Sequence, residues 1–533
     1  MPLMMNANCL KHALCKSRIL TVFALIFCVC FIIPSCHPNR LPPTHSSAIF
    51  TIAMDESPKN IHPHFAFDLN SQLIDEMLFE SLTVLADDTL PTCTRLCQSW
   101  TFKTPTLLVI KLSEPFLKGN LKFSDGTTIT VKDVLASIEI MKHEKNPFKG
   151  AFDIIHSTSF VTPDELHIQL NAPKPSLPID LYLVKILKSS QAIFPQVSPQ
   201  DLIFSGPYTL SQADPASISL SVNPYYGQPA VGEPQNYKPL RLLFIRDEQT
   251  RIFKFMHHEV HAIFNSVPLR SAAGLAKDKN VTLLTTPGFN ISYLGINHLD
   301  PLLKDPMIRR YIYESINIDE LIRYKLHGFG IAHFSLLPMG SPFIHNSVGT
   351  KLTPQQQKMT KTKLKGKILT LKTSNQPQVM SLARVIQSQL ASQGIILKHQ
   401  PLEFGALMDD LNAGNFQLTY GKFVGITDPV VYYDFLHSNF FPPHGRNRGR
   451  FKHAVWDKLS ETLSRETDPQ KRKQLSTQLQ DIFAQELPLI PLWVTQNIVA
   501  LDAKHTLPKL SFRQSLRDFM YLQTPHNGPH AVK

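Results

Sequence analysis

Apolar residues in the second half of the chain alternate between strand-like and helical spacing. The run 368–371 indicates a strand, apolar positions within 382–390 share one helical face, Gly394 ends that helix, and residues 395–397 begin another strand. The same order recurs over 404–420. Because a strand, a helix and a second strand normally form a right-handed parallel crossover, this pattern predicts an α/β fold.

Other stretches carry the residues that begin helices. Between 121 and 134, turn residues follow a short strand, and Thr130 followed three residues later by Asp133 predicts a helix N-cap. Asp305 before a proline predicts a second N-cap, because proline at the first helical position loses no hydrogen bond. Asn70 is expected to cap a third helix, which follows the first strand.

Prolines at 488 and 491 interrupt the apolar segment 487–493 near the end of the chain. Proline cannot donate a hydrogen bond to a neighbouring strand. We therefore expect an edge strand or a hinge crossing there rather than a central strand.

The amino-terminal region has a pattern of its own. Three basic residues precede the apolar run 19–33, and no acidic residue occurs in the first 35 positions. The 15-residue run is shorter than a transmembrane helix, which needs about 20 residues, and is typical of a signal peptide over 1–35. It ends in Ile33-Pro-Ser-Cys36, which resembles a lipoprotein processing box with Cys36 as the lipidated residue. Ordinary signal cleavage or an uncleaved anchor is the alternative.

A proline-rich tether is expected at 36–47, ahead of the folded body. Without residues 1–35 the chain keeps 498 residues and a formal charge of +9, because that segment removes three basic residues and no acid. This length is enough for two or three domains. We expect the charge to be a solvated surface with no nucleic acid partner, because no arginine-rich or basic and aromatic repeat occurs.

Two cysteines remain beyond Cys36 in the exported part of the chain. Cys93 and Cys97 are four residues apart. In an oxidising compartment they form either one small disulfide or two reduced thiols, and the sequence leaves both open.

Catalytic motifs are missing from the sequence. It contains no Gly-x-Ser-x-Gly, no His-Glu-x-x-His and no P-loop motif. We expect a protein that is not an enzyme and uses no cofactor. His257 and His261 would stand one turn apart on a helix and could share a cation there. Because two imidazoles leave a tetrahedral site incomplete, we prefer a polar helix face and predict no metal site.

Several short motifs follow one another in a fixed order. They are the segment 121–134, Ser205-Gly-Pro-Tyr-Thr-Leu210, Asn223-Pro-Tyr-Tyr-Gly227, Tyr293-Leu-Gly-Ile-Asn297 and Leu487-Pro-Leu-Ile-Pro-Leu-Trp493. In this order they resemble the extracytoplasmic solute-binding proteins that feed peptide and nickel ABC importers. The resemblance covers roughly residues 48–500.

The resemblance implies an α/β fold of the two-lobed periplasmic-binding-protein type, with hinge strands between the lobes and an additional subdomain inserted in the first lobe. Lobe I would then comprise 48–86, 201–285 and 495–533, the subdomain 87–200, and lobe II 286–494.

The resemblance also implies a function. The protein would be the substrate-binding component of an ABC importer, a monomer that captures oligopeptides between its lobes and delivers them to the permease. The alternative on the same fold is a metal chelate, haem or a cell-wall peptide derivative as ligand. An exported hydrolase and a surface adhesin are alternatives from other classes.

Ligand contacts are implied for one loop. In these proteins a loop of the form Trp-x-x-Asp-x-x-(Asp or Glu)-Pro offers an aspartate to the α-amino group of the ligand. Here the loop is 422–429, with lysine at the tryptophan position and glycine at the amine-binding position. The ligand-binding residues implied are Lys422, Phe423, Val424, Gly425, Thr427 and Asp428.

Three interpretations of this loop stay open. Asp428 could take over the amine contact, or Lys422 could face an anionic group of a ligand without an amine there. In the simplest interpretation Lys422 points to solvent and Asp428 caps the next turn, as an aspartate before proline often does.

Overall fold

The computed structural model describes residues 49–85, 89–193, 197–227, 238–347, 349–508 and 510–523. The predicted signal peptide, the lipidation site Cys36 and the tether lie outside these residues. Phe50–Lys533 forms one compact unit. Among the described residues, no helix is both long and apolar enough to cross a membrane.

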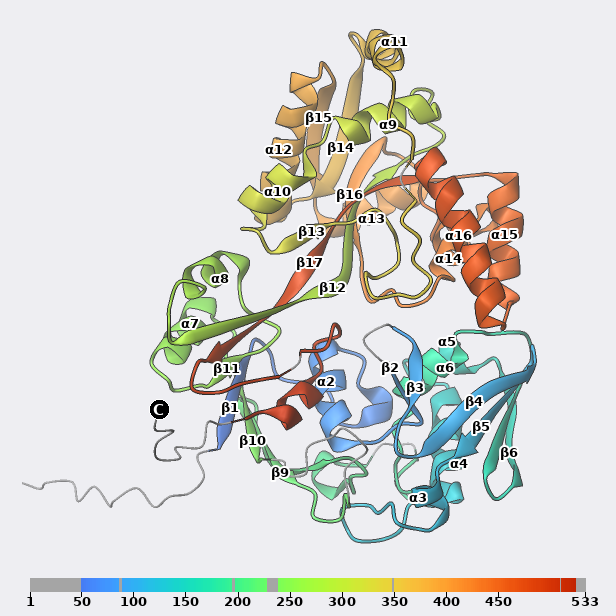
Figure 1. The fold of residues 1–533 in the computed structure, drawn as a ribbon, viewed down its shortest axis with the longest axis vertical. Helices are drawn as coiled ribbons and strands as arrows, with labels where there is room; N and C mark the ends of the chain where they lie inside the picture. Colours follow the sequence, from blue (N-terminus) through green and yellow to red (C-terminus); the bar gives the residue numbers. More distant parts are fainter. Residues whose placement is uncertain are drawn as a thin grey trace, which may run out of the picture. The chain divides into compact units, whose positions relative to one another are not determined.

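A mixed sheet of eleven strands organises the fold (Figure 1). Its order is β15-β14-β16-β12-β17-β11-β1-β10-β9-β8, and β13 pairs with β17 beside this path. The strands are β1 (Phe50–Met54), β8 (Tyr208–Ala213), β9 (Ser217–Val222), β10 (Leu240–Phe244), β11 (Ala262–Ile263), β12 (Val281–Ile296), β13 (Gly330–Ala332), β14 (Ile368–Ser374), β15 (Ile396–Leu402), β16 (Leu418–Phe423) and β17 (Leu489–Asp502).

Two smaller sheets lie within residues 83–170. One pairs β2 with β3, and the other has the order β4-β5-β7-β6. Their strands are β2 (Thr83–Leu85), β3 (Pro91–Cys93), β4 (Cys97–Thr104), β5 (Leu107–Leu112), β6 (Ile155–Thr162) and β7 (Glu165–Leu170). Cys93 and Cys97 form a disulfide with a Cα separation of 5.2 Å, which decides between the two alternatives left by the sequence.

The helices occur throughout the unit. They are α2 (Leu69–Leu78), α3 (Glu114–Leu117), α4 (Val131–Glu139), α5 (Lys149–Phe152), α6 (Leu177–Asp180), α7 (Glu248–Met256), α8 (Leu269–Leu275), α9 (Pro306–Glu314), α10 (Ile318–Lys325), α11 (Pro354–Leu364), α12 (Pro377–Ser392), α13 (Phe404–Ala413), α14 (Val431–Leu436), α15 (Ala454–Arg465) and α16 (Pro469–Glu486). Short 3-10 turns include η1 (Pro63–Phe65), η3 (Leu181–Leu183) and η6 (Leu516–Tyr521).

The predicted crossovers are confirmed. β14 runs parallel to both β15 and β16, with α12 and α13 as the connecting helices. The N-caps at Thr130 and Asp305 are also confirmed, because Asp133 accepts a hydrogen bond from the Thr130 N–H and Asp305 accepts one from Met307. The cap at Asn70 was wrong: Asp68 accepts from the Ser71 N–H, so α2 begins two residues earlier than Asn70 would allow.

β17 is a central strand of the sheet and not an edge strand, because it lies between β12 and β11, so the expectation against a central strand was wrong. It still crosses from one part of the sheet to the other, as the hinge alternative expected. It pairs with β12 over most of its length and with β11 and β13. Pro491 is tolerated because it lies where the β12–β17 register shifts, between Ser292 and Tyr293, and Pro488 precedes the strand. A second irregularity separates Pro287 from Ile291. In Figure 1 these two long strands run side by side through the sheet.

The buried apolar side chains form several clusters. One lies around β1, α2 and η6, a second within residues 82–186, and two more around β12, α12, β16 and α16. Because separate cores support separately packed regions, the clusters suit the predicted lobes and subdomain. The exact boundaries of these domains stay a prediction.

Candidate functional site

The strand directions bring two sets of carboxyl ends face to face. β17 is antiparallel to β12 and to β11, and β1 is parallel to β11, so β1, β11 and β12 point the same way. β16 is antiparallel to the carboxyl half of β12, and β14 is parallel to β16. We call β1, β8, β9, β10 and β11 the β1 half, and β14, β15 and β16 the β16 half.

The carboxyl ends of β1 and β11 therefore point toward the carboxyl ends of β14 and β16. β11 pairs with the carboxyl end of β17, whereas β16 pairs with the opposite end of the β12–β17 ladder. The loop after β1 thus faces the loop after β16. In open α/β sheets, ligands bind outside the carboxyl ends of strands. This arrangement makes the segments 55–68 and 424–430 the two walls of the candidate site.

Lys422 lies near the carboxyl end of β16. Its side chain is exposed, and among the described residues no hydrogen bond or ion pair engages its ammonium group. Burial by surrounding protein nevertheless lowers the pKa of Lys422, and no neighbouring charge contributes to the shift. Lys422 therefore combines an exposed position with partial desolvation of its ammonium group.

Asp428 is neutralised from within the protein. Nη2 of Arg472, on α16, donates to both carboxylate oxygens of Asp428 at 2.7 Å. The Asp428 carboxylate also accepts from the Val430 N–H at 2.8 Å, which fixes the turn before α14. This geometry matches the simplest interpretation, in which Asp428 caps a turn, and an amine contact would have to share the carboxylate with Arg472.

The other predicted loop residues divide into buried and open positions. Phe423 is buried and stacks on Tyr293 with 4.3 Å between ring centroids. Val424 is 74% exposed, and Thr427 is half-buried. Gly425 has φ +67°, and a Cβ built on it would meet no atom within 4 Å. The loop therefore offers backbone, a valine and a lysine to the facing wall.

The wall in the β1 half rests on a buried charge network. Glu76 on α2 accepts hydrogen bonds from Tyr182, Ser515 and Arg513, the last at 3.2 Å. Burial alone would raise the pKa of Glu76, but Arg513, Lys185 and these hydroxyl bonds outweigh it and lower the pKa. The charge on Glu76 is thus matched inside the protein.

Charged groups of α6 and α14 share one environment. Asp180 ends α6 and pairs with Lys174 at 2.7 Å. Burial raises the pKa of Asp180, and Asp428 raises it further. Burial likewise raises the pKa of Asp434 on α14, which Lys174 opposes. Because these influences act over short distances, the segments 174–180 and 428–434 lie close together although they are distant in sequence.

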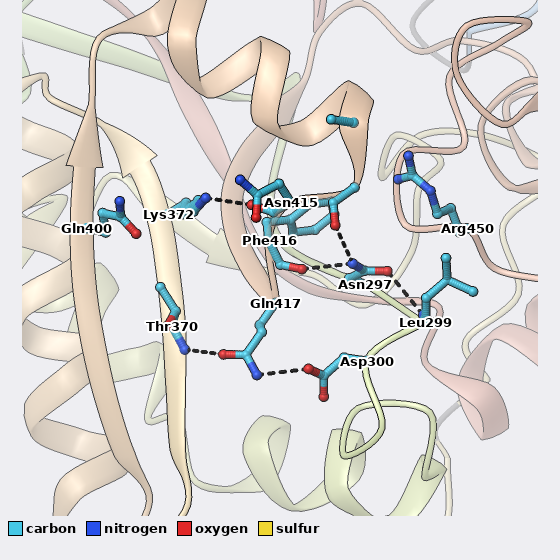
Figure 2. A pocket seen from close by; sticks show the side chains of 12 residues that line it. Asn297, Leu299, Asp300, Thr370, Lys372, Gln400, Asn415, Phe416, Gln417 and Arg450 are labelled. Carbon is cyan, nitrogen blue, oxygen red and sulfur yellow. Dashed lines mark hydrogen bonds between the residues drawn. The ribbon is translucent and has the colours of Figure 1, made fainter.

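A polar cavity of about 520 Å³ lies elsewhere, at the amino end of β16 (Figure 2). Its two cationic side chains are already satisfied. Lys372 donates to Asp410 at 2.7 Å and to the Asn415 carbonyl at 2.6 Å, and Arg450 donates to the carbonyls of Arg448 and Asn412. The cavity therefore offers a ligand no unsatisfied cationic side chain, and its carboxylate, Asp300, accepts hydrogen bonds from neutral donors such as Gln417.

The histidine motif forms no metal site. α7 ends at Met256, so His257 and His261 do not lie one turn apart on a helix, and the expected polar helix face is also absent. His261 accepts from the Thr51 N–H at 2.9 Å, and His258 pairs with Asp502 at 2.8 Å. Throughout the described part of the chain, no group of three His, Cys, Asp or Glu could hold a metal ion.

Sequence reasoning missed Arg472 and Arg513. Arg472 lies 44 residues after its partner Asp428, and Arg513 lies beyond the segment covered by the motifs. An arginine within a helical pattern carries no local sign of a distant partner. The one available signal is the carboxylate of Asp428 itself, because a carboxylate in a partly buried loop normally has a counter-ion elsewhere in the chain.

Two facing sets of strand ends, joined by two crossing strands, define the class of two-lobed binding proteins. The solved structure of MppA, a periplasmic murein tripeptide binding protein in its unliganded open form, has this fold. Its TM-score is 0.75 with 18% identity, and the match covers 89% of this chain and 97% of that one. NikZ from Campylobacter jejuni, solved with Ni(L-His), matches with a TM-score of 0.65, 17% identity, and 87% and 96% coverage.

The chain belongs to the family of bacterial extracellular solute-binding proteins, family 5, whose middle region matches residues 116–441. A curated relative is the probable D,D-dipeptide-binding periplasmic protein DdpA of Escherichia coli K12. It is 24% identical over 406 residues, which cover 72% of this chain and 77% of the relative. The resemblance and the two-lobed α/β fold predicted from the sequence are therefore confirmed.

Proposed function

We propose that this protein is the substrate-binding component of an ABC importer, which captures oligopeptides outside the cytoplasm and passes them to the permease. The observation that carries the proposal is the loop after β16, held opposite the loop after β1 at facing strand ends. Family membership and a relative named as a probable dipeptide-binding protein support it.

Peptide binding suits the chemistry of this loop. An extended ligand can bond to exposed main chain beyond β16, while its side chains remain in wet pockets. Lys422, Val424, Gly425 and Thr427 would supply direct contacts. Phe423 would contribute through its backbone, because its ring is buried against Tyr293.

Asp428 has a supporting role in this proposal. Its pair with Arg472 holds the loop between β16 and α14, and its charge is already matched. We propose that it positions the loop and does not itself bind a ligand amine.

A metal chelate is the second candidate ligand. A protein of the same fold was solved with Ni(L-His), and the unpaired Lys422 would suit the carboxylate of such a chelator. Because the described residues contain no three-ligand metal cluster, the metal would have to arrive with its own ligands. Haem, a cell-wall peptide derivative and a role as adhesin remain alternatives without a specific supporting contact.

We further propose that the protein is tethered to a membrane by a lipid on Cys36, acts as a monomer and performs no covalent chemistry. The basic residues, apolar run and processing box at the amino terminus support the tether. Mass analysis of the mature amino terminus, with Cys36→Ser as the matched variant, tests it.

Native mass spectrometry tests the ligand. The protein is purified from cells without refolding, and any bound molecule is released and fragmented. A ladder of masses that fragments as short peptides is the expected result. One non-peptide mass, or a nickel-containing one, would favour the chelate instead.

A further inference from the structure

Charges within the loop after β16 do not balance. Asp428 is matched by Arg472, and Gly425 carries no charged group. Among the described residues no carboxylate forms an ion pair with Lys422, and no charged neighbour contributes to its pKa shift. The loop therefore presents a single uncompensated charge to the facing wall, and that charge is positive.

The neighbours of Lys422 in the sheet add donors and no acid. Ser292 on β12 lies between Lys422 on one side and Trp493 of β17 on the other, in one row of the sheet. Nε1 of Trp493 is buried and has no hydrogen-bond acceptor among the described residues. The hydroxyls of Ser292 and Tyr420 are 3.1 Å apart and bond one another.

The missing partner of Lys422 is an acceptor, because an ammonium group only donates hydrogen bonds. Trp493 is buried behind Ser292 and does not reach the same acceptor. A partly desolvated ammonium group is stabilised most by an anion, and a carboxylate makes a strong, charge-assisted hydrogen bond with it. An amine at this position would instead meet a like charge.

We propose that Lys422 binds a carboxylate of the peptide, so that the β16 half of the protein holds an acidic end of its ligand and not the amino end. This inference rests on the proposed function. Two sources of the carboxylate share this chemistry, the peptide C-terminus and an Asp or Glu side chain.

Competitive binding of peptide libraries tests the proposal. The full protein is offered three tetrapeptide libraries: free acids without Asp or Glu, the same sequences as C-terminal amides, and amides that contain Glu. Bound masses are compared by native mass spectrometry. We expect the amides without Glu to bind at least about tenfold more weakly than the acids, because a charge-assisted bond is lost. Recovery in the Glu-containing amides would identify a side-chain carboxylate as the source.

Two variants assign the effect. Lys422→Gln should remove the preference for acids over amides, while Lys103→Gln, a matched change at an exposed strand lysine, should keep it. Equal binding of acids and amides by the unmodified protein would overturn the proposal and leave peptide capture intact. Failure of all three libraries to bind would overturn peptide capture itself.

The reverse change offers an independent check. Gly425→Asp places a carboxylate at the loop position where the peptide-binding proteins that this chain resembles have their amine-binding aspartate. The open space around Gly425 accepts the side chain, and aspartate is among the residues that tolerate positive φ. In this variant, N-acetylation of the peptides should weaken binding several-fold, whereas in the unmodified protein it should change binding little. Strong weakening by N-acetylation in the unmodified protein would contradict the proposal.

Discussion

The two walls of the candidate site differ in how their charges are matched. In the β1 half, Glu76 is enclosed by Arg513, Tyr182 and Ser515. In the β16 half, Asp428 is paired with Arg472, whereas Lys422 has no ion-pair partner among the residues that the structure describes.

This difference distinguishes charged groups that stabilise the walls from a charged group that is available to bind the ligand. A buried charge that loses its partner costs several kcal/mol, so matched pairs such as Glu76–Arg513 hold the wall in place. An unmatched charge in an exposed position costs the fold little and remains available to a ligand. Substitutions in the matched pairs of either wall should therefore lower stability, whereas substitution of Lys422 should change ligand binding.

The largest loss of stability is expected for Glu76→Gln. The change leaves Arg513 without its carboxylate in a buried network, and we expect about 4 kcal/mol lower free energy of unfolding. Urea denaturation followed by circular dichroism measures it. A loss below about 1 kcal/mol would show that the network does not support the wall.

Arg472→Leu is expected to cost somewhat less, about 3 kcal/mol, because Asp428 keeps the Val430 N–H as a partner. The same denaturation measurement applies. Lys422→Gln is the matched control in the same wall and should change stability by less than about 0.5 kcal/mol. If both variants lose equal stability, the distinction between support and recognition is wrong.

A smaller, pH-dependent effect is expected at Asp75. This carboxyl on α2 is buried, its Oδ1 has no hydrogen-bond partner, and burial raises its pKa well above the usual range. The folded state therefore keeps a proton that the unfolded state releases, so stability falls as pH rises above the ordinary pKa of aspartate. The variant Asp75→Asn should lack this pH dependence. Above the folded-state pKa, its free energy of unfolding should exceed that of the unmodified protein by about 1.4 kcal/mol for every tenfold difference in proton affinity between the folded and unfolded states.

Urea denaturation between pH 4 and pH 8 measures the Asp75 effect. The unmodified protein should lose stability across this range relative to Asp75→Asn. Parallel curves for the two proteins would mean that Asp75 is ionised in the folded state, where the charge of Lys185 favours the ionised form.

Local patterns were sufficient where neighbours in sequence are neighbours in space. The crossovers at β14, β15 and β16 and the cap at Asp305 follow from spacing and capping chemistry alone. The cap at Asn70 failed because Asp68, two residues earlier, offers an equally good acceptor. Pro491 suggested an edge strand because proline has no N–H to donate. The register shift between β12 and β17 makes this missing donor tolerable, and such a shift cannot be recognised from the sequence of one strand.

The α/β class and the order of motifs follow from the amino-acid sequence alone, and the resemblance added an expected ligand loop. Which charges have partners depends on the tertiary structure. Arg472 reaches Asp428 across 44 residues, and Arg513 reaches Glu76 across 437. Pairing between charges that are distant in sequence depends on how strands and helices pack together. No local sequence pattern contains that information.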